Sequence, residues 1–278
     1  MLTQEKYFES HSNLAASITH ASSRQTYYTI LLLVDHGLTQ DAYRAYAYFR
    51  WLDDQLDVGG MEKSERLAFV RREMALVDQC YGIEGGEPPH LLCEEEYMLV
   101  DLIRSDPDTA SGLQLYIRNM MAVMAFDAER RGRLISQHEL DNYSRWLATA
   151  VTEALHYYIG HHNRAPQIES RYLAATGAHI AHMLRDTVED NAAGYFNIPS
   201  EYLAEHGVDP LNITSDAYRS YVKSRVELAR GYFDAGKEYL AQVENLRCRL
   251  AGYSYIARFT PILNMIEHDG YLLRDRYR

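Results

Sequence analysis

The chain has little cysteine, and its cysteines form no recognisable pattern. Cys80, Cys93 and Cys248 are odd in number, far apart and without a C-x-x-C pair. Such a set predicts neither a disulfide framework nor a zinc knuckle. The first residues lack the basic and apolar regions of a secretory signal, and the longest apolar run, near 30–34, is far shorter than the ~20 residues that span a bilayer. We therefore expect a cytoplasmic protein.

Positive charge is also scarce. The formal charge is −11, from 39 acidic and 28 basic side chains. A nucleic-acid binder needs a basic face from which counterions are released, so this deficit argues against a nucleic-acid partner. Only four of the basic residues are lysine, which leaves arginine as the main cation. Arginine stays charged and binds phosphate oxygens with two parallel hydrogen bonds.

The alternating apolar and polar pattern of β-strands is missing as well. Apolar residues recur instead at three- and four-residue spacing, which is typical of amphipathic helices. The predicted helices are 26–36, 40–57, 63–81, 94–103, 111–131, 137–162, 171–190, 216–241 and 245–273. The connections between them are short, so we predict one all-α domain over residues 1–278, with its helices packed around a central space.

Two D-x-x-x-D pairs lie on separate predicted helices, Asp53 with Asp57 and Asp186 with Asp190. A spacing of four puts both carboxylates of a pair on one helical face, about 5–6 Å apart at Cβ, where they repel by a few tenths of a kcal/mol. A divalent cation would reverse the sign of that interaction. Magnesium favours oxygen ligands and binds through one or two carboxylates together with water and substrate phosphates.

Each pair ends a polar stripe on its helix. Tyr46 and Arg50 precede the first pair on the same face, and His179 and His182 precede the second. A lone D-x-x-x-D is usually a solvated helix face. Here each stripe borders an apolar stripe on the same helix, so we interpret the two as lining one cavity from two sides.

These residues resemble the squalene/phytoene synthase family. R-x-x-D-x-x-x-D at 50–57 and L-R-D-x-x-E-D at 184–190 look like the two signatures of that family. The segment 22–28 is similar to its early Ser/Arg-rich segment, and 194–199 resembles its G-x-x-x-[LI]-P exit. The likeness covers roughly residues 20–275. It implies an all-α isoprenoid synthase fold with an active site in a central cavity.

The resemblance also implies an activity, the head-to-head condensation of two farnesyl or geranylgeranyl diphosphates through a cyclopropyl diphosphate. The products would be phytoene, dehydrosqualene or squalene. The catalytic metal ligands, for two or three magnesium ions with diphosphate, would be Asp53, Asp57, Asp186 and Asp190. The residues implied in substrate binding are Arg24, Tyr46, Arg50, His179, His182, Arg185, Tyr255 and Arg274. NADPH serves the reductive members, and the sequence does not predict it for this chain; the oligomeric state stays open.

The chain departs from the family pattern at several positions. His179 and His182 stand where the family usually has Gln and Asn, and Asn197 replaces the Tyr before the exit Ile/Leu-Pro. Residues 148–152 replace A-G-T-V-G without either glycine. We expect these changes to bear on substrate length and on the second half-reaction more than on metal binding.

Three alternatives stay open. A class I terpene cyclase or a prenyl-diphosphate hydrolase would use the same metal site on one substrate, with the histidines as base or as ligands of water. A non-catalytic relative would keep the fold alone. A di-iron carboxylate bundle would use Glu153-x-x-His156, although a second copy of that motif is missing. A peripheral contact with a membrane for product release is compatible with the head-to-head reaction.

Overall fold

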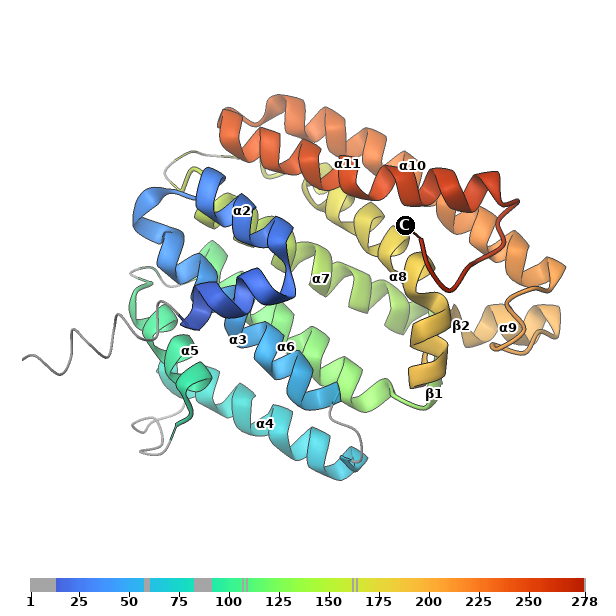
Figure 1. The fold of residues 1–278 in the computed structure, drawn as a ribbon, viewed down its shortest axis with the longest axis horizontal. Coiled ribbons are helices and arrows are strands. Elements are labelled where there is room, and N and C mark those ends of the chain that lie inside the picture. Colours follow the sequence, from blue (N-terminus) through green and yellow to red (C-terminus); the bar gives the residue numbers. More distant parts are fainter. Residues whose placement is uncertain are drawn as a thin grey trace, which may run out of the picture. The chain divides into compact units, whose positions relative to one another are not determined.

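The computed structural model describes residues 14–57, 61–82, 92–106, 108, 110–161, 163 and 165–277. These residues are folded mostly as α-helices (Figure 1), which confirms the predicted all-α class. The contacts between Cα atoms divide the chain into two compact units. The first unit is Met1–Glu129 with His156–His162, and the second is Arg130–Leu155 with Asn163–Arg278. The single domain and its central cavity stay predictions.

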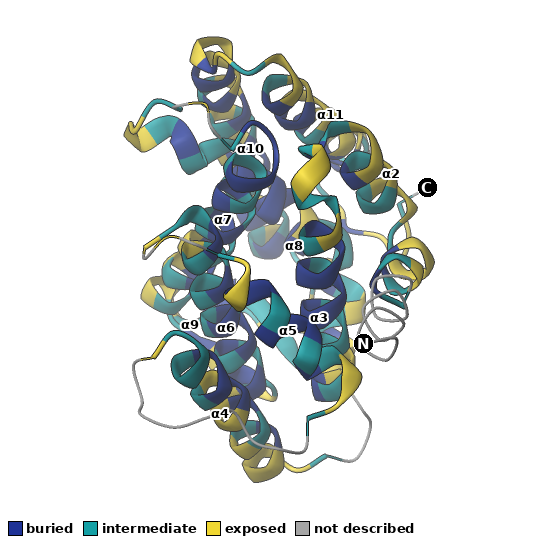
Figure 2. Ribbon diagram, turned by 90° about the vertical axis from the view of Figure 1, so that its left-hand side faces the viewer, coloured by how far each residue is buried: buried dark blue, intermediate teal, exposed yellow. Residues whose placement is uncertain are grey.

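Helices make up the described part of the first unit. After a helix at 14–22, its elements are α2 (Arg24–Leu33), η1 (His36–Leu38), α3 (Thr39–Asp57), α4 (Lys63–Cys80), α5 (Glu94–Arg104) and all but the last residue of α6 (Gly112–Arg130). Helix α3 packs against α5, and its inner face is largely buried (Figure 2). The apolar stripe expected from the sequence is buried as predicted, at Ala45, Phe49, Leu52 and Leu56.

The second unit is arranged around one helix. Its elements are β1 (Arg133–Ile135), most of α7 (Gln137–Tyr158), η2 (Glu169–Tyr172), α8 (Leu173–Ala193), β2 (Tyr195–Pro199), α9 (Ser200–His206), α10 (Asp216–Gln242) and α11 (Leu246–His268). Helix α8 packs against both α10 and α11 (Figure 1). Strands β1 and β2 pair in parallel, with Arg133 opposite Tyr195. These strands are three and five residues long, too short for an alternating pattern to show in the sequence.

Several expected helices end earlier than predicted, among them the helix expected over 26–36, which ends at Leu33. The helix expected over 137–162 ends at Tyr158, because Gly160 adopts a left-handed φ of 81°. The backbone N–H groups of Gly160 and His161 then donate to the Asp35 carboxylate, at 3.0 and 2.9 Å, instead of continuing the helix. Residue 162 lies outside the described residues. The helix expected to reach 273 ends at His268.

Glu153, the glutamate of the di-iron alternative, forms a buried ion pair. Arg171 donates from Nε and Nη2 to the two carboxylate oxygens of Glu153, at 2.9 and 2.8 Å. The Tyr172 hydroxyl donates to the same carboxylate at 2.8 Å. Glu153 therefore serves to neutralise a buried arginine, which argues against the di-iron alternative. None of the described helices is long and apolar enough to cross a membrane.

Helices α8 and α10 approach closely because glycines face the contact. A Cβ atom added to Gly236 of α10 would lie 2.7 Å from the Cβ of Ala174 on α8 and 2.9 Å from its backbone N. These distances are too short for carbon atoms in a packed interior, so only glycine fits there without a shift of one helix. The approach fixes the position of α8, which carries the second aspartate pair.

We expect Gly236→Ala to lower the free energy of unfolding by about 1–3 kcal/mol, because the new methyl group overpacks the contact. Gly231→Ala is the matched control on the same helix, since a Cβ there meets nothing within 4 Å. The control should leave stability unchanged or raise it by up to about 1 kcal/mol, through higher helix propensity. Urea unfolding of both variants measures the difference, and equal effects would contradict the close approach.

Candidate functional site

The first aspartate pair lies at the C-terminal end of α3. Arg50 is one turn earlier, with Nη1 3.2 Å from Oδ2 of Asp53, and it also donates to the carboxylate of Asp54. Asp57 is the last residue of the helix. Carboxylates at a helix C-terminus meet the negative end of the helix dipole, so the dipole adds to their mutual repulsion. Arg50 thus pairs with two of the aspartates at the C-terminal end of α3.

The negative charge of Asp53 is only partly compensated by Arg50. The pKa of Asp53 is raised to about 6, chiefly by partial burial and next by the charge of Asp57. Arg50 acts in the opposite direction without cancelling these effects, while Asp127 of α6 adds to them. We had not predicted Asp127 as a site residue, although it is the only charged side chain in the apolar run 120–128. The charges of Asp57, Asp127 and Asp54 therefore all act on Asp53 at this end of the first unit.

We expect Asp53→Asn to stabilise the metal-free chain at pH 7.5 more than at pH 5. The raised pKa means that the folded state binds more protons than the unfolded state between about pH 4 and 6, so the stability of the wild type falls as pH rises through that range. The asparagine carries no charge and removes that loss. Thermal melting in EDTA at the two pH values measures it.

Asp54→Asn is the matched control for this measurement. Asp54 accepts a hydrogen bond from Arg50, so its loss should bring no stabilisation at either pH. The stability difference between the wild type and Asp53→Asn should change between pH 5 and pH 7.5. An equal difference at the two pH values would contradict the raised pKa of Asp53.

The other predicted residues of the first unit lie on α2 and α3. Tyr46 is one turn before Arg50 on the same face of α3. Arg24 is the first residue of α2 and is exposed, directly after Ser23, whose hydroxyl accepts a hydrogen bond from the Thr26 N–H at 3.2 Å. In the described part of the chain no hydrogen bond or ion pair joins Arg24 to the acidic end of α3.

The second aspartate pair lies on α8 and is better compensated. Asp186 accepts hydrogen bonds from Arg185, at 2.5 and 2.6 Å, and from Nε2 of His182, at 2.9 Å. Burial acts to raise the pKa of Asp186, but the hydrogen bonds from Arg185 and His182 outweigh it and lower the pKa to about 2. Asp186 is therefore ionised at any physiological pH, as a metal ligand must be.

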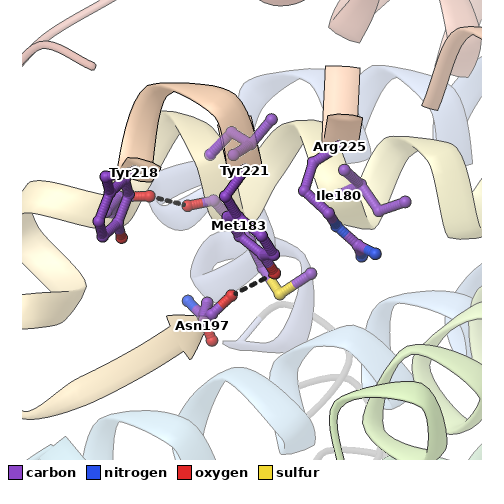
Figure 3. Close-up of a pocket in the computed structure, with 8 residues that line it drawn as sticks. Ile180, Met183, Asn197, Tyr218, Tyr221 and Arg225 are labelled. Atoms are coloured by element: carbon purple, nitrogen blue, oxygen red, sulfur yellow. Dashed lines mark hydrogen bonds between the residues drawn. The ribbon is translucent and has the colours of Figure 1, made fainter. Parts of the chain in front are cut away.

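Asp190 is held by an amide. The Nδ2 of Asn197 on β2 donates to Oδ2 of Asp190 at 2.7 Å, and its Oδ1 accepts from Nη1 of Arg130 at 2.8 Å. The Tyr221 hydroxyl donates to the backbone carbonyl of Asn197 at 3.2 Å (Figure 3). The sequence showed Asn197 only as a departure from the family pattern, and it did not point to Arg130 at all.

A small pocket lies on the α10 side of this amide. Arg225 and Tyr221 of α10 face α8 across it (Figure 3). Its lining residues are Ile180, Met183, Leu184, Thr187, Asn197, Tyr218, Tyr221 and Arg225. The wall on the α8 side is apolar apart from Thr187, whose hydroxyl donates to the Met183 carbonyl at 2.8 Å. The polar groups of the pocket therefore come mainly from α10 and β2.

The two predicted histidines have different environments. The side chain of His182 is 49% exposed and binds Asp186, whereas His179 is only 5% exposed. Neither ring nitrogen of His179 has a hydrogen-bond partner among the described residues, and its ring contacts the edge of Tyr143, with centroids 5.0 Å apart. The pKa of His179 is lowered to about 3, chiefly by burial and to a smaller extent by the charges of His182 and Arg130. His179 is therefore neutral.

Tyr255 and Arg274 are placed differently relative to the aspartates of α8. The Tyr255 ring lies 5.3 Å from Phe259, whose ring lies 6.1 Å from His182. Arg274 instead binds Asp269, beyond the end of α11. In the described part of the chain no hydrogen bond or ion pair joins Arg274 to Asp186 or Asp190. Tyr255 thus contacts Phe259, which in turn lies beside His182, the partner of Asp186.

Known proteins are similar to this chain over most of its length. A family model described as squalene/phytoene synthase matches residues 19–278. A stretch of 111 residues, 37% of this chain, is 31% identical to a chloroplastic phytoene synthase of Daucus carota, and 30% identical to that of an Oncidium hybrid cultivar. The stretch spans only 28% and 27% of these two proteins.

Two solved structures share the fold. A squalene synthase, HpnC, from Alicyclobacillus acidocaldarius aligns with a TM-score of 0.71 at 17% identity, over 95% of this chain and 96% of that one. A dehydrosqualene synthase solved with a ligand aligns with a TM-score of 0.72 at 18% identity, over 98% and 90% of the two chains. At these identities the likeness establishes the all-α fold.

Proposed function

Because this chain belongs to the squalene/phytoene synthase family, we propose that it joins two prenyl diphosphates head to head through a cyclopropyl diphosphate. The family consists of prenyltransferases that act on diphosphate substrates with a divalent metal. One observation of this chain carries the proposal. Asp53 sits among the carboxylates of Asp57 and Asp127 with a pKa raised to about 6, which is the state of an acidic site whose cation is supplied from outside the chain.

The donor set fits magnesium. Asp53 and Asp57 in one unit and Asp186 and Asp190 in the other offer only carboxylate oxygens, the ligands that Mg²⁺ prefers. Among the described residues no three His, Cys, Asp or Glu side chains are arranged to hold a metal ion by themselves. In this proposal the diphosphate and water therefore complete the coordination. The metal would stabilise the negative charge that develops on the leaving diphosphate.

The arginines beside the aspartates have a proposed second task. Arg50 bridges Asp53 and Asp54, and Arg185 binds Asp186 through two nitrogens. A guanidinium has five N–H donors, so each can keep a carboxylate partner and still donate to a diphosphate oxygen. Arg24 and Tyr46 are assigned to the same diphosphate by the family resemblance.

Aromatic side chains near the second pair suit the hydrocarbon part of the reaction. Phe259 is buried between Tyr255 and His182, and such rings attract a carbocation through their faces. A hydrocarbon product is insoluble in water, so the proposal includes release at a membrane surface.

Incubation with farnesyl or geranylgeranyl diphosphate, magnesium, and either NADPH or no reductant tests the activity, with mass spectrometry of the products. Formation of phytoene from the longer substrate alone would assign a C20 enzyme. NADPH-dependent squalene, or dehydrosqualene without NADPH, would assign a C15 enzyme. A cyclic or hydroxylated C15 product would overturn the head-to-head proposal in favour of a cyclase or hydrolase. No turnover of either substrate would favour a non-catalytic relative.

We expect Asp53→Ala and Asp186→Ala each to abolish turnover, by at least about a thousandfold, while the far-UV circular dichroism stays that of the wild type. The physical reason is the loss of a carboxylate that binds the metal–diphosphate. Asp234→Ala is the matched control, because Asp234 is an exposed aspartate of α10 that pairs with Lys237. The control should keep wild-type turnover. Substantial product from either of the two test variants would refute the assignment.

A further inference from the structure

The amide of Asn197 has only one orientation that satisfies both of its neighbours. A carboxylate cannot donate a hydrogen bond and a guanidinium cannot accept one. The contact of 2.7 Å to Asp190 must therefore come from the amide nitrogen, and the contact of 2.8 Å to Arg130 must go to the amide oxygen. Few side chains supply a donor and an acceptor at these two positions, and asparagine is one of them.

The backbone fixes both ends of this arrangement. Asn197 is the middle residue of β2, whose pairing with β1 sets Arg133 opposite Tyr195. The Gly132 N–H donates to the Gly194 carbonyl at 2.8 Å, so the end of α6 and the end of α8 are tied together just before the strands. The short parallel pair thus brings Asn197 and Arg130 to Asp190.

Arg130 is itself immobilised. Its side chain is 4% exposed, and its guanidinium lies over the rings of Tyr143 and Tyr195, 4.6 and 5.0 Å from their centroids. Two cation–π contacts hold the guanidinium plane in place. The hydroxyl of Tyr221 donates to the backbone carbonyl of Asn197. The side-chain amide is therefore oriented by Asp190 and Arg130, and the backbone that carries it is held by Tyr221.

We propose that Asn197 is a positioning residue, which holds the Asp190 carboxylate in the orientation that the metal–diphosphate requires. The orientation of Asn197 is in turn fixed by its hydrogen bond from Arg130. The inference rests on the proposed function. Partners behind a metal ligand typically change metal affinity by 10–100-fold when they are lost. Asparagine suits this role because its amide hydrogen bonds to Asp190 without neutralising it, whereas an aspartate at 197 would repel that carboxylate and an apolar residue would remove this hydrogen bond.

The first test is calorimetric titration of the full chain with Mg²⁺ in the presence of inorganic diphosphate. Asn197→Leu keeps the number and branching of the side-chain heavy atoms without a polar atom, and we expect it to weaken Mg²⁺ binding by about 10–100-fold. Asn197→Ser, which leaves room for a water beside a hydroxyl, serves if the first variant does not fold, with the same direction of change. Asn264→Ala is the matched control, because Asn264 is an exposed asparagine of α11 that contacts Arg230. It should bind like the wild type.

The second readout separates positioning from a structural role. We expect the magnesium concentration for half-maximal product formation to rise by the same factor in the Asn197 variants, while turnover recovers at saturating magnesium. A merely structural residue would lower turnover at every magnesium concentration. Wild-type affinity for Mg²⁺ in both Asn197 variants would overturn the inference and leave the proposed function standing. A wild-type chain that does not bind Mg²⁺ with diphosphate would overturn the proposed function itself.

Discussion

Repulsion between carboxylates placed one helical turn apart is the constraint on which the candidate site depends, and the two pairs meet it differently. On α8 the protein compensates it locally, since Asp186 is bound by Arg185 and His182 and its pKa falls to about 2. On α3 the single Arg50 is shared with Asp54, and the pKa of Asp53 rises to about 6. Asp186 is therefore ionised and hydrogen-bonded, whereas the charge of Asp53 is only partly compensated within the chain.

Because of this difference, the two pairs would gain different amounts of free energy from a bound metal ion. A carboxylate that is already hydrogen-bonded gains less from a metal but is held in a fixed geometry. A crowded carboxylate gains more from a metal, because binding removes repulsion as well as adding attraction. Strain of this kind is common at functional sites, where stability is given up for binding. In the proposed enzyme, α8 would supply geometry and α3 would supply the larger gain on metal binding.

The sequence was sufficient for the helices and the aspartate pairs, because both depend on spacing within one segment. It was insufficient wherever a contact joins distant segments. Asn197 contacts Arg130 because two strands of three and five residues pair in parallel. Neither strand has a sequence pattern that predicts this pairing. The early end of α7 depends likewise on Asp35, more than a hundred residues away, which accepts the N–H groups that a longer helix would have used.

The histidines show the same limit at the scale of one helix turn. His179 and His182 are three residues apart, and the sequence assigned both to the substrate. In the structure His182 is a partner of Asp186, while His179 is buried against Tyr143 and stays neutral because burial lowers its pKa to about 3. A neutral imidazole can accept a proton or donate one hydrogen bond, but it adds no charge to oppose a diphosphate. Of the two, His182 contacts the carboxylate of Asp186, whereas His179 lies in the interior against Tyr143.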